Sequence, residues 1–435
     1  MPLFLPRRKI PPLALLFLLI LPSPGAAAPL MGYIEGAGKN TVTVTQAAPF
    51  GGSSRAADLQ RAVSGNLALL PFVEEIDARG VPGGAAVEAP GGQGLTFERF
   101  VLAGVNLLIT ANWVDGGHVE MRCFSAGEGR FLFGNRYTVA PGQEGLRDMA
   151  DKFCANFLDA VIGNGAFFRS NLAFIRTAGP RKKDVWVMRP NGRFLRRVTN
   201  IPGEALSPAW SPDGRFVLFT HIDARTHALG VWDSGRRTVQ RIKFPGNTVI
   251  GPAFMPDNRV AVSLTDGRNP SIFLLNHLFQ KDRKLDDSLS IDVSPSVDAS
   301  GTRMAFTSNR HGNPHIFLKD LRTGTVTRVT SAGRYNTDPS ISPDGTVVVF
   351  ARRDSGGHRI YAYDLVTNQE RQISFGPGSD EQPEFAPDGY FVTFMSTRSG
   401  QKRIYVITRH GGAAKLLPTG QGDASFPAWG PAARG

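Results

Sequence analysis

A proline-centred motif that recurs at a fixed interval places the strongest constraint on this chain. Its fullest copy is Ser207-Pro208-Ala209-Trp210-Ser211-Pro212-Asp213-Gly214. Variants of the motif begin at five later prolines, Pro252, Pro295, Pro339, Pro383 and Pro427. The successive intervals are 44, 43, 44, 44 and 44 residues. A period in the low forties with several short β segments in each period is typical of a β-propeller.

The repeats predict six blades, the last of which is assembled from both ends of the repeat region. After most anchors, three short runs rich in β-branched and aromatic residues follow; residues 282–289 are too charged for a prediction. Three such runs also precede the first anchor, at residues 172–175, 185–188 and 196–199. They lack an anchor strand of their own, and the motif at residues 427–429 supplies it. Closing the ring in this way pairs strand edges that would otherwise be free.

The chain begins with the features of a cleaved export signal. Arg7, Arg8 and Lys9 precede an uncharged apolar stretch at residues 10–21, and a small-residue segment follows. Twelve helical residues span about 18 Å, which is too short for a bilayer core. We expect residues 1–27 to be removed, leaving a mature protein that begins at Ala28 and does not span a membrane.

Residues 28–166 contain no copy of the repeat and are predicted to form an α/β domain, followed by the propeller at residues 167–435. Helical spacing of apolar residues indicates helices at 56–70, 96–104 and 145–162, the last ending at Gly163. Runs at 41–46, 106–113, 118–124 and 130–139 are predicted strands. The expected fold class is therefore an α/β N-terminal domain before an all-β six-bladed propeller.

The chain contains two cysteines, Cys123 in a predicted strand and Cys154 on the apolar side of a predicted helix. Both are expected in one core. An oxidising compartment permits a disulfide between them but does not require it. The sequence leaves two alternatives open, a bonded pair or two buried thiols.

Neither the charge nor the motifs indicate an enzyme or a nucleic-acid-binding protein. The formal charge of +12 falls to +9 without the signal, and the basic residues are dispersed. The sequence lacks a nucleophile elbow, a P-loop and an H-E-x-x-H zinc motif. We therefore expect no catalytic residue, no metal and no cofactor.

The conspicuous residues of the motif are interpreted as scaffold. Asp213, Asp344 and Asp388 could form a ring of metal-binding carboxylates, but Pro-Asp-Gly is a turn sequence, and recurrence at one strand junction is what a turn requires. The aromatic residues of the anchors are expected to pack between blades rather than to stack on a ligand. These residues are Trp210, Phe254, Phe385 and Trp429.

The segments that lead into the anchors are the better candidates for binding, because they differ from blade to blade. They are predicted to be loops that gather around one mouth of the central channel. Loops held on a rigid scaffold commonly carry function. The segments are residues 205–207, 247–249, 291–293, 336–338, 380–382 and 424–426.

Taken together, the chain resembles the TolB family of the Tol-Pal envelope system. The resemblance rests on the exported precursor, the α/β domain that comes first and the junction at residues 158–175. It also rests on Ser-Pro-Ala-Trp-Ser-Pro-Asp-Gly at 207–214 and on the closing Phe426-Pro427-Ala428-Trp429. It implies a periplasmic, non-enzymatic scaffold that supports outer-membrane integrity and constriction of the outer membrane during cell division.

The resemblance also implies two partners. The channel mouth is expected to bind the peptidoglycan-associated lipoprotein Pal through Asn247, Thr248, Asp292, Asn336, Thr337, Asp338, Asp380 and Glu381. The mature N-terminal segment, residues 28–36, is expected to bind TolA through Ala28, Leu30, Met31, Tyr33, Ile34 and Glu35. Two other functions remain alternatives, a carbohydrate- or metal-binding propeller and the propeller of a serine peptidase.

Overall fold

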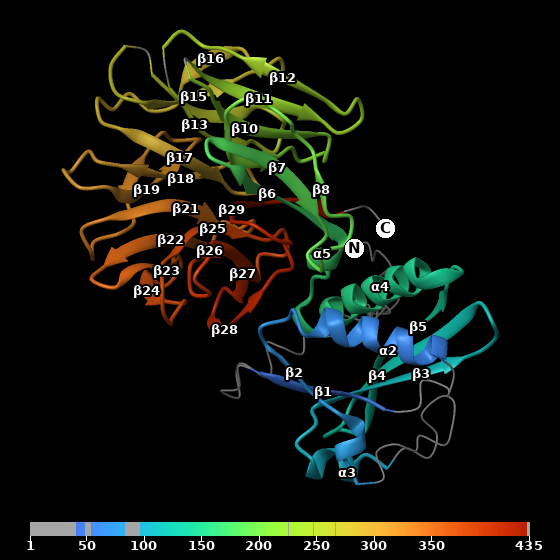
Figure 1. The fold of residues 1–435 in the computed structure, drawn as a ribbon. Helices are drawn as coiled ribbons and strands as arrows, with labels where there is room; N and C mark the ends of the chain where they lie inside the picture. The colour runs from blue at the N-terminus through green and yellow to red at the C-terminus, as the bar shows by residue number, and fades with distance from the viewer. Residues whose placement is uncertain are drawn as a thin grey trace, which may run out of the picture.

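The computed structural model describes residues 41–47, 54–82, 96–224, 226–246, 248–265 and 267–432. The expected signal and the N-terminal segment at 28–36 lie outside the described residues. The described chain forms a mixed sheet with helices, followed by a ring of antiparallel sheets (Figure 1). None of its helices is long and apolar enough to cross a bilayer.

The first part is built on a five-stranded sheet with the order β2-β1-β3-β4-β5. Its strands are β1 (Val42–Gln46), β2 (Val73–Ile76), β3 (Leu107–Trp113), β4 (His118–Ser125) and β5 (Arg130–Thr138). The strand β1 pairs in parallel with β2 and β3, whereas the pairs β3–β4 and β4–β5 are antiparallel. The predicted strands at 41–46, 106–113, 118–124 and 130–139 are therefore confirmed.

Two long helices, α2 (Ser54–Leu67) and α4 (Gly142–Ile162), pack against each other and against this sheet. A 3₁₀ turn, η1 (Ala78–Gly80), and the short helices α3 (Glu98–Leu102) and α5 (Ala166–Arg169) complete this part. The helix α4 ends at Gly163, whose φ of 81° is the left-handed conformation that glycine adopts readily. Its predicted end is thus confirmed.

Two details of this part differ from the sequence prediction. The strand β2 was not predicted, because Glu74 and Glu75 at its centre interrupt the apolar alternation of a half-buried strand. The helix α3 has one apolar residue fully inside: Phe100 is buried, whereas Val101 is 46% exposed. Adjacent residues of an α-helix point about 100° apart, so Phe100 faces the core while Val101 points away from it.

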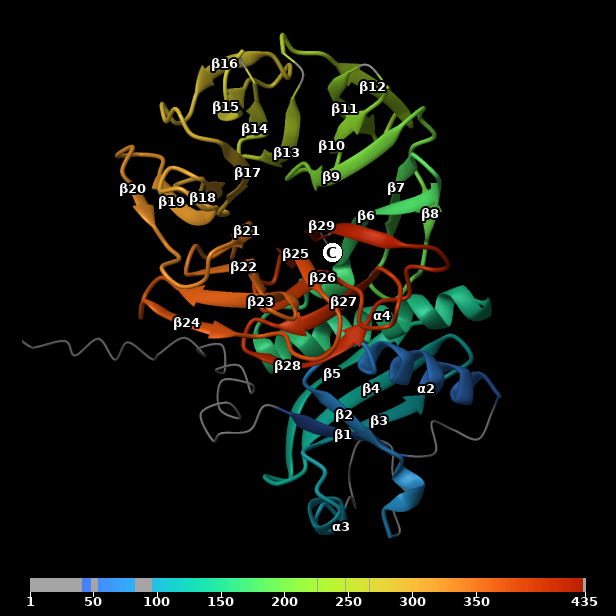
Figure 2. The same ribbon diagram turned by 60° about the vertical axis from the view of Figure 1, so that its left-hand side comes forward.

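The second part is a ring of blades around a central axis (Figure 2). Each blade has four antiparallel strands, and the strand that carries the proline anchor is the innermost. The segment that the sequence left open supplies β16, an exposed outer strand in which the charged residues face solvent. A charged sequence is expected there, because edge strands with lysines resist pairing with other chains.

The strands fall into blades as follows. The first three blades are β9 (Glu204–Trp210), β10 (Phe216–Ile222), β11 (His227–Asp233), β12 (Thr238–Ile242); β13 (Val249–Phe254), β14 (Val260–Leu264), β15 (Ser271–Leu275), β16 (Lys281–Lys284); and β17 (Asp292–Val297), β18 (Arg303–Ser308), β19 (His315–Asp320), β20 (Val326–Arg328). The next two are β21 (Asn336–Ile341), β22 (Val347–Asp354), β23 (Gly357–Asp364), β24 (Gln369–Gln372); and β25 (Asp380–Phe385), β26 (Phe391–Ser396), β27 (Arg403–Thr408), β28 (Gly411–Leu416).

The remaining blade combines the end of the chain with the start of the repeat region. The last strand, β29 (Ala424–Ala432), pairs antiparallel with β6 (Ser170–Gly179). The strand β7 (Lys182–Met188) follows β6, and β8 (Arg196–Arg197) pairs with β7. One bridge between Lys183 and Glu204 joins this blade to the one that begins with β9.

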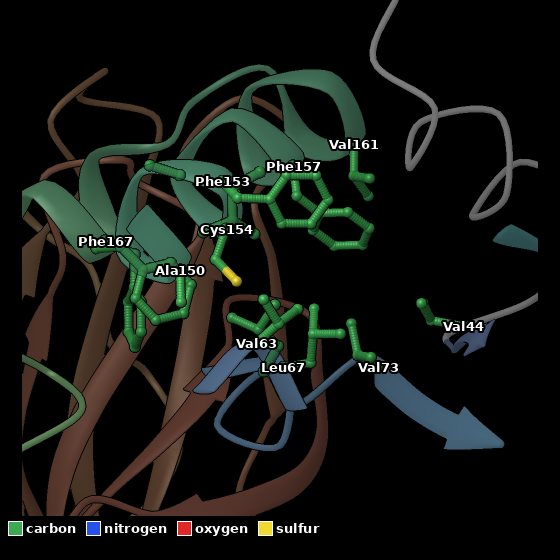
Figure 3. Packing of buried hydrophobic residues seen from close by; sticks show 14 of the residues in the cluster. Val44, Val63, Leu67, Val73, Ala150, Phe153, Cys154, Phe157, Val161 and Phe167 are labelled. Carbon is green, nitrogen blue, oxygen red and sulfur yellow. The ribbon is translucent and has the colours of Figure 1, made fainter. Parts of the chain in front are cut away.

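An apolar core connects the helical part to the propeller. Phe167 of α5 is fully buried, and its ring centroid lies 4.7 Å from that of Phe391 and 5.3 Å from that of Trp429. Phe72, which precedes β2, stacks on Phe391 at 6.0 Å. Figure 3 shows Phe167 in the same cluster as the inward faces of α2 and α4. The two parts therefore share a core.

A charged cluster reinforces this contact. Arg193, in the β7–β8 turn, donates to Asp151 at 2.5 Å, Asp148 at 2.6 Å and Glu144 at 2.9 Å, all on α4. The side chains of Arg193 and Asp151 are 9% and 8% exposed, whereas those of Glu144 and Asp148 are mostly exposed. The turn of one blade is thus tied to the longest helix.

Both cysteines are free and fully buried in this core, and Figure 3 shows Cys154 among its apolar neighbours. The structure therefore has the two buried thiols, not the bonded pair. Burial raises the pKa of both thiols, because the apolar surroundings disfavour the charged thiolate.

Candidate functional site

The turns of the motif are scaffold, as predicted. The Asp213 carboxylate accepts from the backbone N–H of Arg215 at 3.0 Å, and Gly214 has a φ of 71°. Asp344 and Asp388 make the same kind of contact with the residues that follow them. Each aspartate bonds its own backbone, and each glycine takes the left-handed conformation.

Every inner strand contains a bulge at the residue immediately before its anchor proline. These residues have left-handed φ values, which non-glycine residues adopt rarely. The pairing of each inner strand with its neighbour also shifts register at this point. The residues are Ser207 (46°), Gly251 (54°), Ser294 (55°), Asp338 (53°), Gln382 (57°) and Phe426 (51°).

The bulges bring six residues of five different types to the axis of the ring. All six residues line a central cavity of about 420 Å³, together with the anchor prolines. Because a bulge re-aims a side chain without breaking the sheet, the ring can vary these positions while keeping its strands paired. The equivalent positions hold two serines, a glycine, an aspartate, a glutamine and a phenylalanine.

Two carboxylates face the cavity on one side. Burial raises the pKa of Glu384 to about 7, and a hydrogen bond with Ser340 opposes this shift. Burial also raises the pKa of Asp338 to about 6, and the nearby charge of Glu381 adds to the rise. Near neutral pH this side of the channel is therefore only partly ionised.

The anchor aromatics pack between blades but also reach the cavity. Trp429 donates from Nε1 to Thr393 Oγ1 of the neighbouring blade at 2.9 Å. Phe385, Trp210 and Phe254 each lie in a cluster that also contains apolar residues of the preceding blade. All four also line the central cavity. The packing between blades is thus confirmed, and the channel wall has aromatic as well as polar residues.

The segments predicted as loops are instead the first residues of the inner strands. Three of the predicted binding residues are therefore strand residues: Asp292, Asn336 and Asp380 are the first residues of β17, β21 and β25. The side chains of all three are buried. Alternation along a strand turns them into the blade, so that the next residues face the channel.

Each of the three buried side chains is held by an arginine. Asp292 accepts from Arg310 at 3.1 Å, and Asp380 accepts from Arg398 at 3.0 Å through both of its oxygens. The Nε atom of Arg352 donates to the Asn336 side chain at 2.8 Å. These contacts hold the blades together, so Asp292, Asn336 and Asp380 are not available to a partner.

Three other candidates meet at one pocket. Thr337, Asp338 and Glu381 line a hollow of about 350 Å³ that adjoins the central cavity, since Ser294 and Asp338 line both. We call this hollow the mouth pocket. The remaining lining residues are Val293, Thr307, Tyr335, Arg353 and His358. Of the two other candidates, Thr248 is partly buried beside β13 and does not line this pocket, and Asn247 lies outside the described residues.

Sequence reasoning missed Tyr335, Arg353 and His358, because two of them belong to the β22–β23 hairpin rather than to an anchor segment. Arg353 opposes His358 across this hairpin. His358 Nδ1 lies 3.5 Å from Glu381 Oε1, and the rings of Tyr335 and His358 are 6.2 Å apart. Glu381 also accepts from Ser379 Oγ at 2.8 Å. An aromatic, a cation and two acids thus converge on a single opening.

Four exposed apolar side chains lie in the connections that lead into β17, β21 and β25, namely Leu289 (75% exposed), Ile291 (39%), Tyr335 (40%) and Phe375 (62%). Of these, Tyr335 lines the mouth pocket. Aromatic residues are enriched in protein-binding surfaces. Within the described residues, no group of three or more His, Cys, Asp or Glu side chains is arranged to hold a metal ion.

The fold defines a class: a six-bladed propeller that follows an α/β domain. Residues 158–433 match the family model described as TolB beta propeller domain. The chain therefore belongs to the TolB family.

Relatives of known name support this assignment. The chain is 52% identical over 311 residues to "Tol-Pal system protein TolB" of Nitratidesulfovibrio vulgaris, covering 69% of this chain and 70% of that protein. It is 28% identical over 301 residues to "Protein TolB homolog" of Chlorobium luteolum, covering 67% and 66%. The crystal structure of TolB from Acinetobacter baumannii superposes with a TM-score of 0.75 at 21% identity, covering 90% and 97%; at this identity it bears on the fold alone.

Proposed function

We propose that this chain is a periplasmic, non-enzymatic scaffold of the Tol-Pal system that binds a Pal-type lipoprotein at the mouth pocket. It would support outer-membrane integrity and constriction of the outer membrane during division. The mature N-terminal segment, residues 28–36, would bind TolA; this assignment rests on the family resemblance.

The mouth pocket is the observation that carries the proposal. It gathers Thr337, Asp338 and Glu381, three of the residues expected to face Pal, in a chain that is 52% identical over 311 residues to a Tol-Pal protein. The pocket combines two acids, a cation and aromatic rings in one opening, and complementary charges across an interface select the register and orientation of a partner. No feature of the described residues favours the carbohydrate- or metal-binding alternative or the peptidase alternative.

The proposal is tested by calorimetric titration of the mature protein with the lipid-free domain of the Pal-type lipoprotein. Glu381→Lys should weaken the complex at least about tenfold, because it reverses a charge in the pocket. Asp282→Lys is the matched control: it makes the same change on the exposed outer strand β16 of another blade. No complex with the wild-type protein at low or moderate salt would refute the partner, and equal losses for both variants would refute the site.

Residues 28–36 are tested separately. A mature chain that begins at residue 37 should lose binding to the periplasmic domain of TolA and keep binding to the lipoprotein. Retention of TolA binding by the shortened chain would contradict this part of the proposal.

A further inference from the structure

Four blades share an arginine that lies over a cross-strand pair of aromatic rings. The guanidinium carbon lies between 4.0 and 5.8 Å from the ring centroids in every case. Such cation–π contacts position the arginine but leave its N–H groups free to find acceptors. The sets are Arg310 over Phe306 and Phe317, Arg352 over Phe350 and Tyr361, Arg398 over Phe394 and Tyr405, and Arg176 over Phe174 and Trp186.

In three of these blades the chain supplies the acceptors itself. Arg310 contacts Asp286 and Asp292, and Arg398 contacts Asp380. Arg352 contacts Asn336 and both oxygens of Glu370, at 2.5 and 2.6 Å. In each case one acceptor is the first residue of the inner strand.

The blade made from β29 and β6 keeps the arginine and its rings but lacks the acceptor. Its inner strand begins with Ala424, which pairs with Arg176 as Asn336 pairs with Arg352. The Nε and Nη2 atoms of Arg176 are buried and have no hydrogen-bond partner among the residues that the structure describes. Asp184, across the strand from Arg176, does not fill the gap, because Arg197 holds it at 2.7 Å.

The charge of Arg176 is also not balanced by its other neighbours. Burial lowers the pKa of its guanidinium, and the nearby Arg403 adds to the effect, so the surroundings are positive as well as poorly hydrated. The Asp423 carboxylate, just before β29, accepts from the Lys402 N–H. Buried donors of a charged group without acceptors are costly, and such a group binds an incoming carboxylate strongly.

We propose that Arg176 is a docking point for one carboxylate of the protein that binds at the channel mouth. The proposal rests on the proposed function, since it assumes that a partner covers this end of the ring. The position fits, because Ala424 begins its inner strand at the end where Asn336 and Asp380 begin theirs.

Gly420 packs directly against this guanidinium. A side chain there would lie 2.3 Å from Arg176 Nη2, and Gly420 has a φ of 78°. The arginine as a whole is only partly buried. A glycine at this position therefore leaves room for the guanidinium, which a larger residue would displace.

The test uses substitutions that remove the arginine or satisfy it internally. Arg176→Gln should weaken lipoprotein binding about tenfold or more, the value of a charge-assisted hydrogen bond. Ala424→Asp places in this blade the acid that the sibling blades hold at Asp292 and Asp380. This variant should therefore have a higher melting temperature than the wild type. Its affinity for the lipoprotein should fall about as much as that of Arg176→Gln. Ala424→Asn, of the same shape but uncharged, should weaken binding less.

Removing acidic residues of the partner one at a time should identify one whose loss has no further effect in the Arg176→Gln protein. If the wild-type protein binds the lipoprotein and Arg176→Gln changes the affinity less than twofold, this inference is wrong. The proposed function would still stand. If the wild-type protein binds no lipoprotein, the proposed function fails, and this inference fails with it.

Discussion

Removing Arg193 should destabilise the protein by about 3–5 kcal/mol. The substitution Arg193→Gln leaves Asp151, which is 8% exposed, without its cation. Breaking a buried ion pair by removing one partner costs this amount, because the other charge stays buried. The lower end is expected here, because Asp151 also accepts from Asn66 at 2.9 Å and Asn191 at 2.7 Å. The exposed acids Glu144 and Asp148 add less than about 1 kcal/mol each.

The dependence on pH has a definite sign. Burial raises the pKa of Asp151 in the folded protein, and Arg193 opposes this shift. Without Arg193 the folded-state pKa rises further, so the variant loses stability as pH increases from the unfolded-state value upward. The loss of stability of Arg193→Gln relative to the wild type should therefore be larger at pH 7 than at pH 4.

The assay is scanning calorimetry on four proteins: the wild type, the single variants Arg193→Gln and Asp151→Asn, and the double variant that combines them. A loss of 4 kcal/mol lowers the melting temperature of a chain of this size by about 4 °C if it unfolds in one transition. The double variant should recover most of the loss, since it removes the unpaired charge. A change below about 0.5 kcal/mol, or fully additive single effects, would refute the assignment of Arg193 as the tie between the propeller and α4.

Three further predictions follow from other buried groups. Glu384→Gln should stabilise the protein increasingly as pH rises from about 4.5 to about 7. Burial raises the folded-state pKa of Glu384 to about 7, so the wild type loses stability over this range as the carboxyl ionises, whereas the glutamine variant does not. Melting curves across this range check the prediction, and a difference in melting temperature that does not change with pH would contradict it. Phe167→Ala should cost about 3–5 kcal/mol in denaturant unfolding, because its ring fills the core between Phe391 and Trp429; a loss under 1 kcal/mol would count against a shared core. Cys123 and Cys154 should resist a thiol reagent until the protein unfolds, and rapid labelling in the native state would show that the core opens.

The architecture was predictable because its signals are local and repeated. A proline that presets the backbone, an aspartate that bonds its own turn and a glycine with left-handed φ occur together at three of the six strand junctions, 212–214, 343–345 and 387–389, and variants of this turn occur at two more. Their spacing predicted the blades before any strand was assigned. The outer strand β16 could not be predicted, because an exposed edge strand carries no apolar alternation.

The candidate site was predictable only in part, and the reason is a shift of one residue. The sequence predicts that the segments leading into the anchors are loops, in which all polar side chains would be exposed. They are strands, so Asn336 turns inward to Arg352 while Thr337 reaches the mouth pocket. The bulge at Asp338 then re-aims that carboxylate toward the channel. The contribution of His358 depends on the pairing of β22 with β23, which brings it to Glu381 from a different part of the blade.

Hydrogen exchange with and without the Pal-type lipoprotein tests the central claim most directly. The account predicts protection at the first residues of β17, β21 and β25, at the β22–β23 hairpin and in the connections that carry Leu289, Tyr335 and Phe375. The outer strand β16 should exchange at the same rate in both states. Protection confined to α2 and α4, with none around the mouth pocket, would contradict the account.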